Sequence, residues 1–100
     1  MIIYNETIIV DEAIHIEWLA WMKLVHIPNV LSTGCFQSYK ILTVLDSPNE
    51  GVTYCFQYHA DDLNDVNLFY SKYIQDLHAA HNQLFENKFV MFNTLMQKVD

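Results

Sequence analysis

One histidine interrupts an apolar stripe on the second of two predicted helices. The other stripe positions are apolar or aromatic: Val66, Tyr70, Tyr73, Leu77 and Leu84. Helical periodicity predicts an apolar side chain at His81 as well. A histidine facing a core can exchange a proton with a bound molecule. It can also be a structural residue hydrogen-bonded to Tyr54, Tyr58 or a backbone carbonyl, and this second interpretation is favoured.

If His81 is catalytic, it acts as a general acid or base, while Tyr58 and Asn5 orient an oxygen of the substrate. These three residues are the candidate catalytic set. Polar positions also interrupt the otherwise apolar strands: Asn5, Thr7, Gln57, His59 and Asn93. If they share a face, they provide the few oriented polar groups of a ligand cavity, or they form hydrogen bonds at a dimer seam.

The other histidines do not predict a metal site. His15 and His26 share a helical stripe, and at 1.5 Å per residue they lie roughly 16 Å apart. His78 and His81 have i, i+3 spacing, but a metal needs three or four ligands. His26 precedes Pro28 and is expected to cap the end of a helix, where the dipole stabilises a protonated imidazole.

Aromatic and sulfur-containing side chains gather in the first predicted helix. Trp18, Trp21 and Met22, with Phe36, are expected mainly in the core, because such a stripe needs no ligand to explain it. They also supply the walls of a candidate apolar pocket. The residues assigned to that pocket are Trp18, Trp21, Met22, His26, Phe36, Tyr54 and Gln57.

Composition bounds the class of protein. The 100 residues form a single expected domain over positions 1–100, with 52% hydrophobic and 14% aromatic residues. The net charge is −7 and arginine is absent, so nucleic acid and anionic membranes are excluded as partners. There is no signal peptide and no apolar run that could span a membrane, so a cytoplasmic protein is expected.

The order of predicted elements is strand, helix, strand, strand, helix, strand. The strands are expected at residues 2–10, 35–45, 52–60 and 86–99. One helix runs from Asp11 to a stop at Pro28, with its stripe at Ile14, Trp18, Trp21, Met22 and Val25. A further turn closes at Gly34, and the second helix covers residues 61–85. This order predicts an α+β, ferredoxin-like βαββαβ sandwich with an antiparallel four-stranded sheet.

Two further expectations follow from the strands. Their apolar side chains lie on both faces, so a second copy of the sheet is expected to cover the face without helices, giving a homodimer. If Leu45 and Val52 flank the hairpin turn, Cys55 is expected near Leu42, about seven residues from Cys35, which is beyond the range of a disulfide. Both cysteines are therefore expected to be free, as in a reducing compartment.

Several short motifs together resemble domain-of-unknown-function family 4286, a group of short bacterial proteins. They are Ile3-Tyr4-Asn5, Trp18-x-x-Trp21-Met22, His26-Ile27-Pro28, Gly34-x-Phe36, Gly51-Val52-Thr53-Tyr54, Gln57-Tyr58 and Phe89. The resemblance implies the dimeric α/β-barrel superfamily, which includes antibiotic-biosynthesis-type monooxygenases, haem-degrading proteins and polyketide cyclases. Glu6 departs from the pattern, because an apolar residue is expected there.

The resulting function hypothesis is a homodimeric small-molecule-binding domain with an apolar pocket between helices and sheet. Its ligand would be small and apolar or aromatic, and no cofactor is predicted. One alternative is a cofactor-independent monooxygenase- or cyclase-like enzyme that uses His81. A second is a haem-binding protein with His26 or His81 as the axial ligand.

Overall fold

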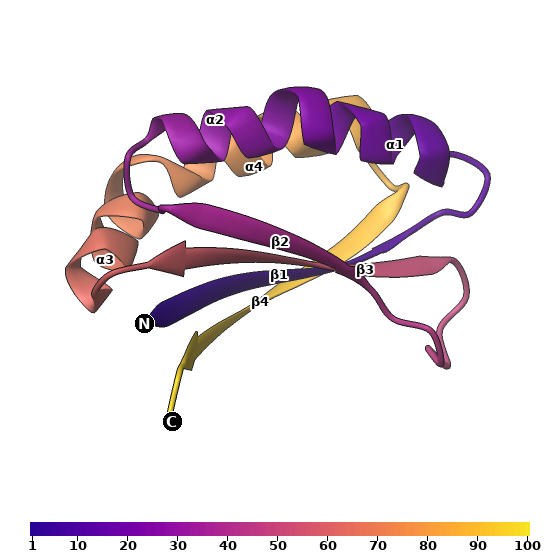
Figure 1. Cartoon of the computed structure of the whole chain (residues 1–100). Helices are drawn as coiled ribbons and strands as arrows, with labels where there is room; N and C mark the ends of the chain where they lie inside the picture. Colours follow the sequence, from indigo (N-terminus) through magenta and orange to yellow (C-terminus); the bar gives the residue numbers. More distant parts are fainter.

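A four-stranded antiparallel sheet carries all the helices on one of its faces (Figure 1). The computed structural model describes residues 1–100, and its strands lie in the order β2-β3-β1-β4. The elements are β1 (Ile2–Val10), α1 (His15–Trp21), η1 (Met22–His26), α2 (Ile27–Ser32), β2 (Ser38–Thr43), β3 (Val52–Ala60), α3 (Leu63–Lys72), α4 (Ile74–Phe85) and β4 (Phe89–Gln97). The predicted ferredoxin-like βαββαβ order is thus confirmed. None of the helices has the length and apolar character that crossing a bilayer requires.

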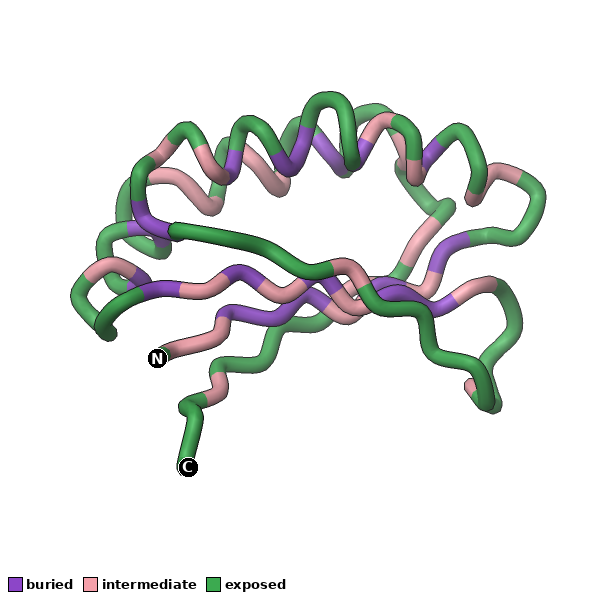
Figure 2. The backbone as a smooth tube through the Cα atoms, viewed as in Figure 1, coloured by how far each residue is buried: buried purple, intermediate pink, exposed green.

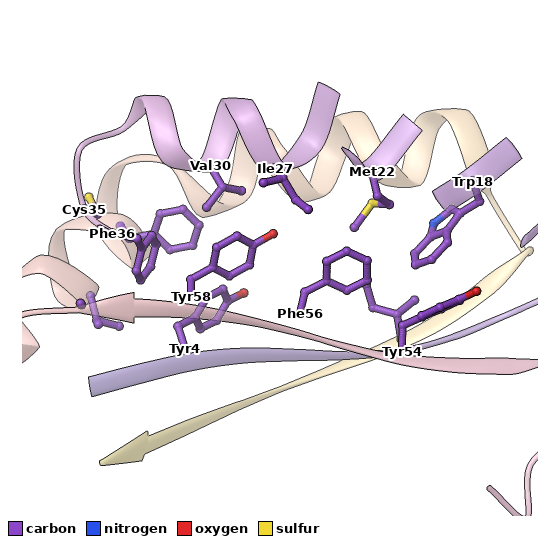
Figure 3. Close-up of a cluster of buried hydrophobic side chains, with 14 of the residues drawn as sticks. Tyr4, Trp18, Met22, Ile27, Val30, Cys35, Phe36, Tyr54, Phe56 and Tyr58 are labelled. Atoms are coloured by element: carbon purple, nitrogen blue, oxygen red, sulfur yellow. The ribbon is translucent and has the colours of Figure 1, made fainter. Parts of the chain in front are cut away.

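Strand register divides the sheet into a helix face and an open face. Tyr4 pairs with Tyr58, and the next residue, Asn5, pairs with Gln57. Because side chains alternate along a strand, each pair lies on the opposite face from the other. The tyrosine pair belongs to the buried core beneath the helices (Figure 3), whereas Asn5 and Gln57 belong to the open face.

Pro28 does not end the first helix, contrary to the prediction. Helix α1 continues through η1, one wide π-helical turn, into α2 as a single rod (Figure 1). In that turn the N–H of Ile27 donates to the carbonyl of Met22, five residues earlier. Pro28 then falls in the first turn of α2, where its missing N–H costs little. The wide turn therefore accommodates the proline without breaking the rod.

The wide turn also changes which residues face the sheet. Trp18 and Met22 are fully buried, as predicted, but the next buried position is His26. Val25, predicted to continue the stripe, is 39% exposed. A turn of more than four residues rotates the following side chains about the axis, which explains the shift of one position. His26 therefore lies in the middle of the continuous helical rod, with its side chain facing the sheet, and it does not cap a helix end.

The second predicted helix is divided at Tyr73 into α3 and α4. Asp62 caps α3, because its carboxylate accepts hydrogen bonds from the N–H groups of Asn64 and Asp65 at 2.8 and 3.4 Å. Phe69 is buried in the core, whereas Leu84, predicted to lie in the stripe, is 59% exposed. The change of direction at Tyr73 separates the two helices, so one continuous stripe does not describe them.

The turns between the elements lie broadly where the sequence predicts them, although two strands are shorter than expected. Gly34 closes the first rod with a φ of +78°, as expected for a left-handed cap. β2 and β4 are shorter than predicted, because residues 35–37 and 86–88 form the turns that lead into them. Cys55 pairs with Leu42 in the hairpin, and both cysteines are free thiols, as predicted.

The open face carries exposed apolar side chains on the two edge strands, β2 and β4, most of whose residues are not buried (Figure 2). Val90 and Phe92 of β4 are 63% and 54% exposed, and Leu42 of β2 is 42% exposed. Between them Asn5 is buried, and its side-chain Oδ1 has no hydrogen-bond partner. This face therefore combines an apolar surface with an unpaired amide oxygen near its centre.

Candidate functional site

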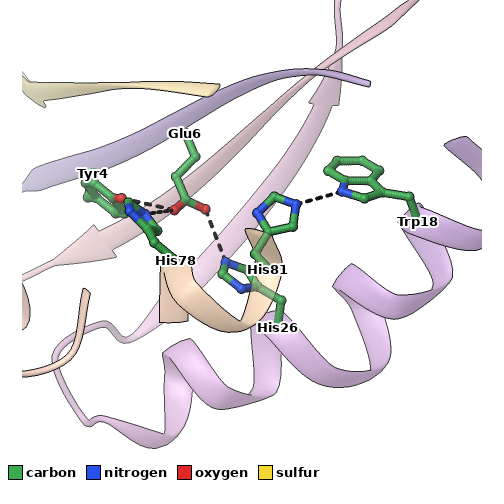
Figure 4. A network of polar contacts seen from close by, with 6 residues as sticks. All are labelled: Tyr4, Glu6, Trp18, His26, His78 and His81. Carbon is green, nitrogen blue, oxygen red and sulfur yellow. Dashed lines mark hydrogen bonds and ion pairs between the residues drawn. The ribbon is translucent and has the colours of Figure 1, made fainter. Parts of the chain in front are cut away.

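A buried carboxylate, Glu6, lies at the centre of a polar cluster beneath the helices (Figure 4). The Tyr4 hydroxyl donates to its Oε2 at 3.0 Å. Nε2 of His78 lies 3.4 Å from the same oxygen, and Nε2 of His26 lies 3.3 Å from Oε1. The three partners come from β1, α4 and η1. The cluster therefore links the first strand to two helices of the layer above it, η1 and α4.

Glu6 is on the helix face because it alternates with Tyr4 and Ile8 along β1. Burial alone favours the neutral acid, but hydrogen bonds and positive charge from His26 and His78 outweigh it and lower the pKa of Glu6 to about 2. The side chain is therefore ionised at neutral pH. An ionised carboxylate only accepts hydrogen bonds, so both histidines present a protonated Nε2 to it.

His81 is fully buried and is held by three aromatic side chains. The indole N–H of Trp18 donates to its Nε2 at 2.8 Å. One face of the imidazole stacks on Phe89, with ring centroids 3.9 Å apart and planes at 7°, and Trp21 stacks at 5.7 Å. The predicted partners, Tyr54, Tyr58 or a carbonyl, are wrong, because the first helix supplies the donor.

The electrostatic state of His81 follows from these contacts. Burial and the neighbouring His26 lower its pKa to about 4, so the ring is neutral at pH 7. Because Nε2 accepts from Trp18, the proton of the neutral ring is on Nδ1. This Nδ1 is buried without a partner, and in Figure 4 that side of the ring is turned toward Glu6 and His26.

A groove opens where α4 passes over the beginning of β4. It has a volume of about 460 Å³ and is more apolar than polar. Its wall on the helix consists of Ile74, Gln75, His78, Ala79 and Asn82, and its floor consists of Phe89 and Met91. The groove thus lies between a helix and the sheet and next to the Glu6 cluster.

The structure does not bring all the candidate catalytic residues together. His81 and Tyr58 are both on the helix face and fully buried, and the Tyr58 hydroxyl has no hydrogen-bond partner. Burial and the charge of Glu6 raise the pKa of Tyr58 well above its usual value. Asn5 is on the open face, on the other side of the sheet, because it is one residue from Tyr4.

The predicted pocket residues are distributed through the core and do not line the groove. Trp18, Met22, Phe36 and Tyr54 are buried core residues (Figure 3), whereas His26 is buried in the polar cluster (Figure 4). Trp21 is partly buried against His81. Gln57 lies on the open face with Asn5, Thr7 and His59. Asn93, expected with them, pairs with Glu6 and belongs to the helix face.

Sequence reasoning missed the residues of the Glu6 cluster as a site. The signal was present: one acidic residue stands among Ile2, Tyr4, Ile8 and Val10 on a single strand face. It is a polar exception on an apolar face, as His81 is on its helix. His78 gave no comparable signal, since a histidine on a helix surface is ordinary.

The histidines do not form a metal or haem site as packed. No group of three or more histidine, cysteine or acidic side chains is arranged to hold a metal ion. His26 and His81 are both almost fully buried, and neither lines the groove. An axial haem ligand must face a space that admits the porphyrin, so these two side chains do not fit that role.

Comparison with known proteins identifies the family and the fold. The model of the Domain of unknown function (DUF4286) family matches residues 1–99, so the chain belongs to this family. The sequence matches none of the curated proteins with which it was compared.

Solved structures with the same fold have low sequence identity. SnoaB from Streptomyces nogalater, described as a cofactor-independent oxygenase, superposes with a TM-score of 0.72 at 11% identity, covering 99% of this chain and 93% of SnoaB. HapK from Hahella chejuensis gives 0.71 at 13% identity over 99% and 93% of the two chains. An ethyl tert-butyl ether D (EthD) family protein from Bacillus halodurans gives 0.69 at 12% identity over 99% and 100%. These likenesses establish the fold.

Proposed function

We propose that this member of the DUF4286 family is a homodimeric small-molecule-binding protein whose ligand lies in the groove between α4 and β4. The observation that carries the proposal is the composition of that groove. Apolar side chains of Ile74, Phe89 and Met91 provide a surface for an apolar body, and His78 and Asn82 provide polar contacts. A mostly apolar concavity with a few polar groups is typical of small-molecule sites.

The charge of the chain narrows the class of ligand. A net charge of −7 disfavours anionic ligands and supports a neutral, apolar or aromatic one. The edge of β4 leaves one side of the groove open, which permits direct entry from solvent. The protein is also proposed to act in the cytoplasm. Its two cysteines are free thiols, which is typical of a reducing compartment.

The homodimer is proposed to form through the open face of the sheet. Exposed Val90, Phe92 and Leu42 give this face the apolar surface that a second copy covers. A twofold arrangement sets the same sheet face of each copy against the other and closes the pair into an α/β barrel. The unpaired Oδ1 of Asn5 supports the proposal, since a partner sheet offers it donors that its own chain lacks.

A second candidate is a cofactor-independent enzyme acting on an apolar substrate in the same groove. The specific observation is that His78 lines the groove and contacts the buried carboxylate of Glu6. SnoaB shares the fold and is described as a cofactor-independent oxygenase. In this candidate His81 acts behind the groove as a positioning residue, because it is fully buried.

A matched pair of substitutions tests the location of the ligand. Ala79 lines the groove, while its neighbour Ala80 is also exposed but does not. Thermal shifts are measured against a panel of neutral aromatic and polyketide-like fragments. Fragments that stabilise the wild type should stabilise Ala80→Trp equally and should fail to stabilise Ala79→Trp, in which the indole fills the groove. Equal stabilisation of both variants would place binding elsewhere, and chemical conversion of any fragment would favour the enzyme.

A further inference from the structure

His78 connects the groove to the buried carboxylate. It is the only groove residue whose side chain is within hydrogen-bond distance of Glu6, with 3.4 Å between Nε2 and Oε2. Its side chain is 30% exposed, whereas that of Glu6 is 1% exposed. One edge of the imidazole therefore meets the core cluster, while the residue as a whole remains accessible to a molecule in the groove.

The carboxylate determines which nitrogen of His78 is free. When the His78 ring is neutral, its Nε2 carries the proton that Glu6 accepts as a hydrogen bond, which leaves Nδ1 with an unshared electron pair. The Glu6 carboxylate also lies 3.4 Å from Nε2, close enough to hold by a hydrogen bond the imidazolium that forms when Nδ1 takes up a proton. The pair thus has the composition of a general base.

We propose that Nδ1 of His78 accepts the proton of a weakly acidic hydroxyl carried by a neutral ligand in the groove, with Glu6 as the positioning residue. This inference rests on the proposed function. The ligand O–H bond breaks and the proton forms an N–H bond at Nδ1. The ligand becomes an oxyanion, and the imidazolium remains hydrogen-bonded through Nε2 to Glu6. Charge is conserved, and no oxidant or cofactor enters the step.

The surroundings of the pair support this role. Tyr4 and His26 each donate a hydrogen bond to Glu6, so the carboxylate is fixed in position when His78 changes its charge. His81, one turn further along α4, is kept neutral by burial and adds no competing positive charge at pH 7. Glu6 is the only carboxylate within ion-pair distance of these histidines.

The test compares two probes that differ by one proton. 4-Nitrophenol has an acidic hydroxyl, and its phenolate has a visible absorption band. 4-Nitroanisole has the same body without the proton. Each is titrated with protein at a pH below the solution pKa of 4-nitrophenol, and affinity and phenolate absorbance are recorded. Wild type should generate the phenolate band on binding and should bind 4-nitrophenol roughly tenfold more tightly than 4-nitroanisole, as expected for a hydrogen bond involving a charged group.

Variants separate the roles of the two residues. His78→Phe should abolish the phenolate band while 4-nitroanisole still binds, and His15→Gln, outside the groove, should behave as wild type. Glu6→Gln should weaken the band and leave 4-nitroanisole affinity within about twofold. A merely structural role for Glu6 would lower binding of both probes together. If Glu6→Gln fails to fold, Glu6→Asp replaces it, because it keeps a buried carboxylate but withdraws it from Nε2 of His78, and it should weaken the band in the same way.

Three results would overturn the inference. In the first, wild type binds 4-nitrophenol and 4-nitroanisole equally well and produces no phenolate band. This result would exclude the proton transfer but would leave ligand binding in the groove unaffected. Another is persistence of the band in His78→Phe. The third is failure of both probes to bind at millimolar concentration. The Ala79→Trp and Ala80→Trp variants test ligand binding in the groove independently. Failure of the proposed function can therefore be distinguished from failure of proton acceptance by His78.

Discussion

Oε1 of Glu6 lies 3.3 Å from Nε2 of His26, and both side chains are at most 2% exposed. A strand and a helical rod are thus joined by a buried ionisable pair. His26 reaches this position because the π-helical turn at η1 brings it to the sheet in place of Val25. The same turn accommodates Pro28, so one local distortion explains both features.

Removal of the Glu6 carboxylate should destabilise the fold strongly. Glu6→Ala leaves the Tyr4 hydroxyl and two histidine N–H groups without an acceptor and should lower the unfolding free energy by about 3–5 kcal/mol. Glu6→Gln retains one acceptor oxygen and should cost less, about 1–3 kcal/mol. Urea unfolding at pH 7 measures both values. Equal stability of wild type and Glu6→Ala would show that the buried cluster contributes nothing.

Acidification should destabilise the protein in two steps. The folded-state pKa of His81 is about 4 against an ordinary 6.5, and that of Glu6 is about 2 against 4.5. In both cases the unfolded chain binds the proton more readily, so the unfolding free energy decreases as the pH is lowered. The decrease from His81 occurs between about pH 6.5 and 4, and that from Glu6 between about pH 4.5 and 2.

Each of these groups contributes a slope of at most about 1.4 kcal/mol per pH unit. Urea unfolding at a series of pH values measures the slope. His81→Gln keeps an acceptor for Trp18 and should flatten the upper step alone. A wild-type stability that rises on acidification from pH 6.5 to 4 would contradict the assigned protonation states.

The two glycines should respond differently to substitution by alanine. Both have positive φ, +78° at Gly34 and +92° at Gly51. A Cβ at Gly34 meets nothing within 4 Å, whereas at Gly51 it would lie 2.5 Å from the carbonyl oxygen of Val10. Gly34→Ala should therefore cost about 1 kcal/mol from backbone strain alone. Gly51→Ala should cost clearly more in the same denaturation measurement, and the reverse order would contradict the turn geometry.

A charge on the open face should prevent dimer formation. Phe92→Asp places a carboxylate on the open face within the proposed interface and should give a monomer in sedimentation or light-scattering measurements at micromolar concentration. Leu24→Asp is the matched control, because Leu24 is 76% exposed on the helical rod. It should leave the wild-type dimer unchanged. A wild-type protein that is monomeric at the same concentration would contradict the proposed dimer.

The sequence predicts the element order well because alternation and helical periodicity are strong, local signals. It places the start of the second helix at residue 61, next to the cap Asp62, and it places Cys55 close to its partner Leu42. It misplaces the end of the first helix, since a proline normally breaks a helix and nothing local announces a π-helical turn. Because the π-helical turn is not predicted, the burial of His26 against the sheet is not predicted either.

The site could be anticipated only in part. His81 is recognisable as a polar exception in an apolar stripe, but its partner Trp18 is 63 residues away, and their contact depends on how the two helices pack. Glu6 is the same kind of exception on a strand. Alternation along β1 already separates Asn5 from Tyr4, so the helix-face cluster and the open-face polar residues are distinct groups.

Two methionines on one strand give the most direct test of ligand binding in the groove. Met91 lines the groove on the helix face, and Met96, five residues along β4, lies on the open face. In protein labelled with ¹³C at the methionine methyl groups, titration with a neutral aromatic fragment is followed by NMR. If the ligand occupies the groove, the Met91 methyl resonance should shift as the site is saturated, while that of Met96 should stay unchanged. Movement of Met96 with Met91 unchanged would contradict it and would place binding on the opposite face of the sheet.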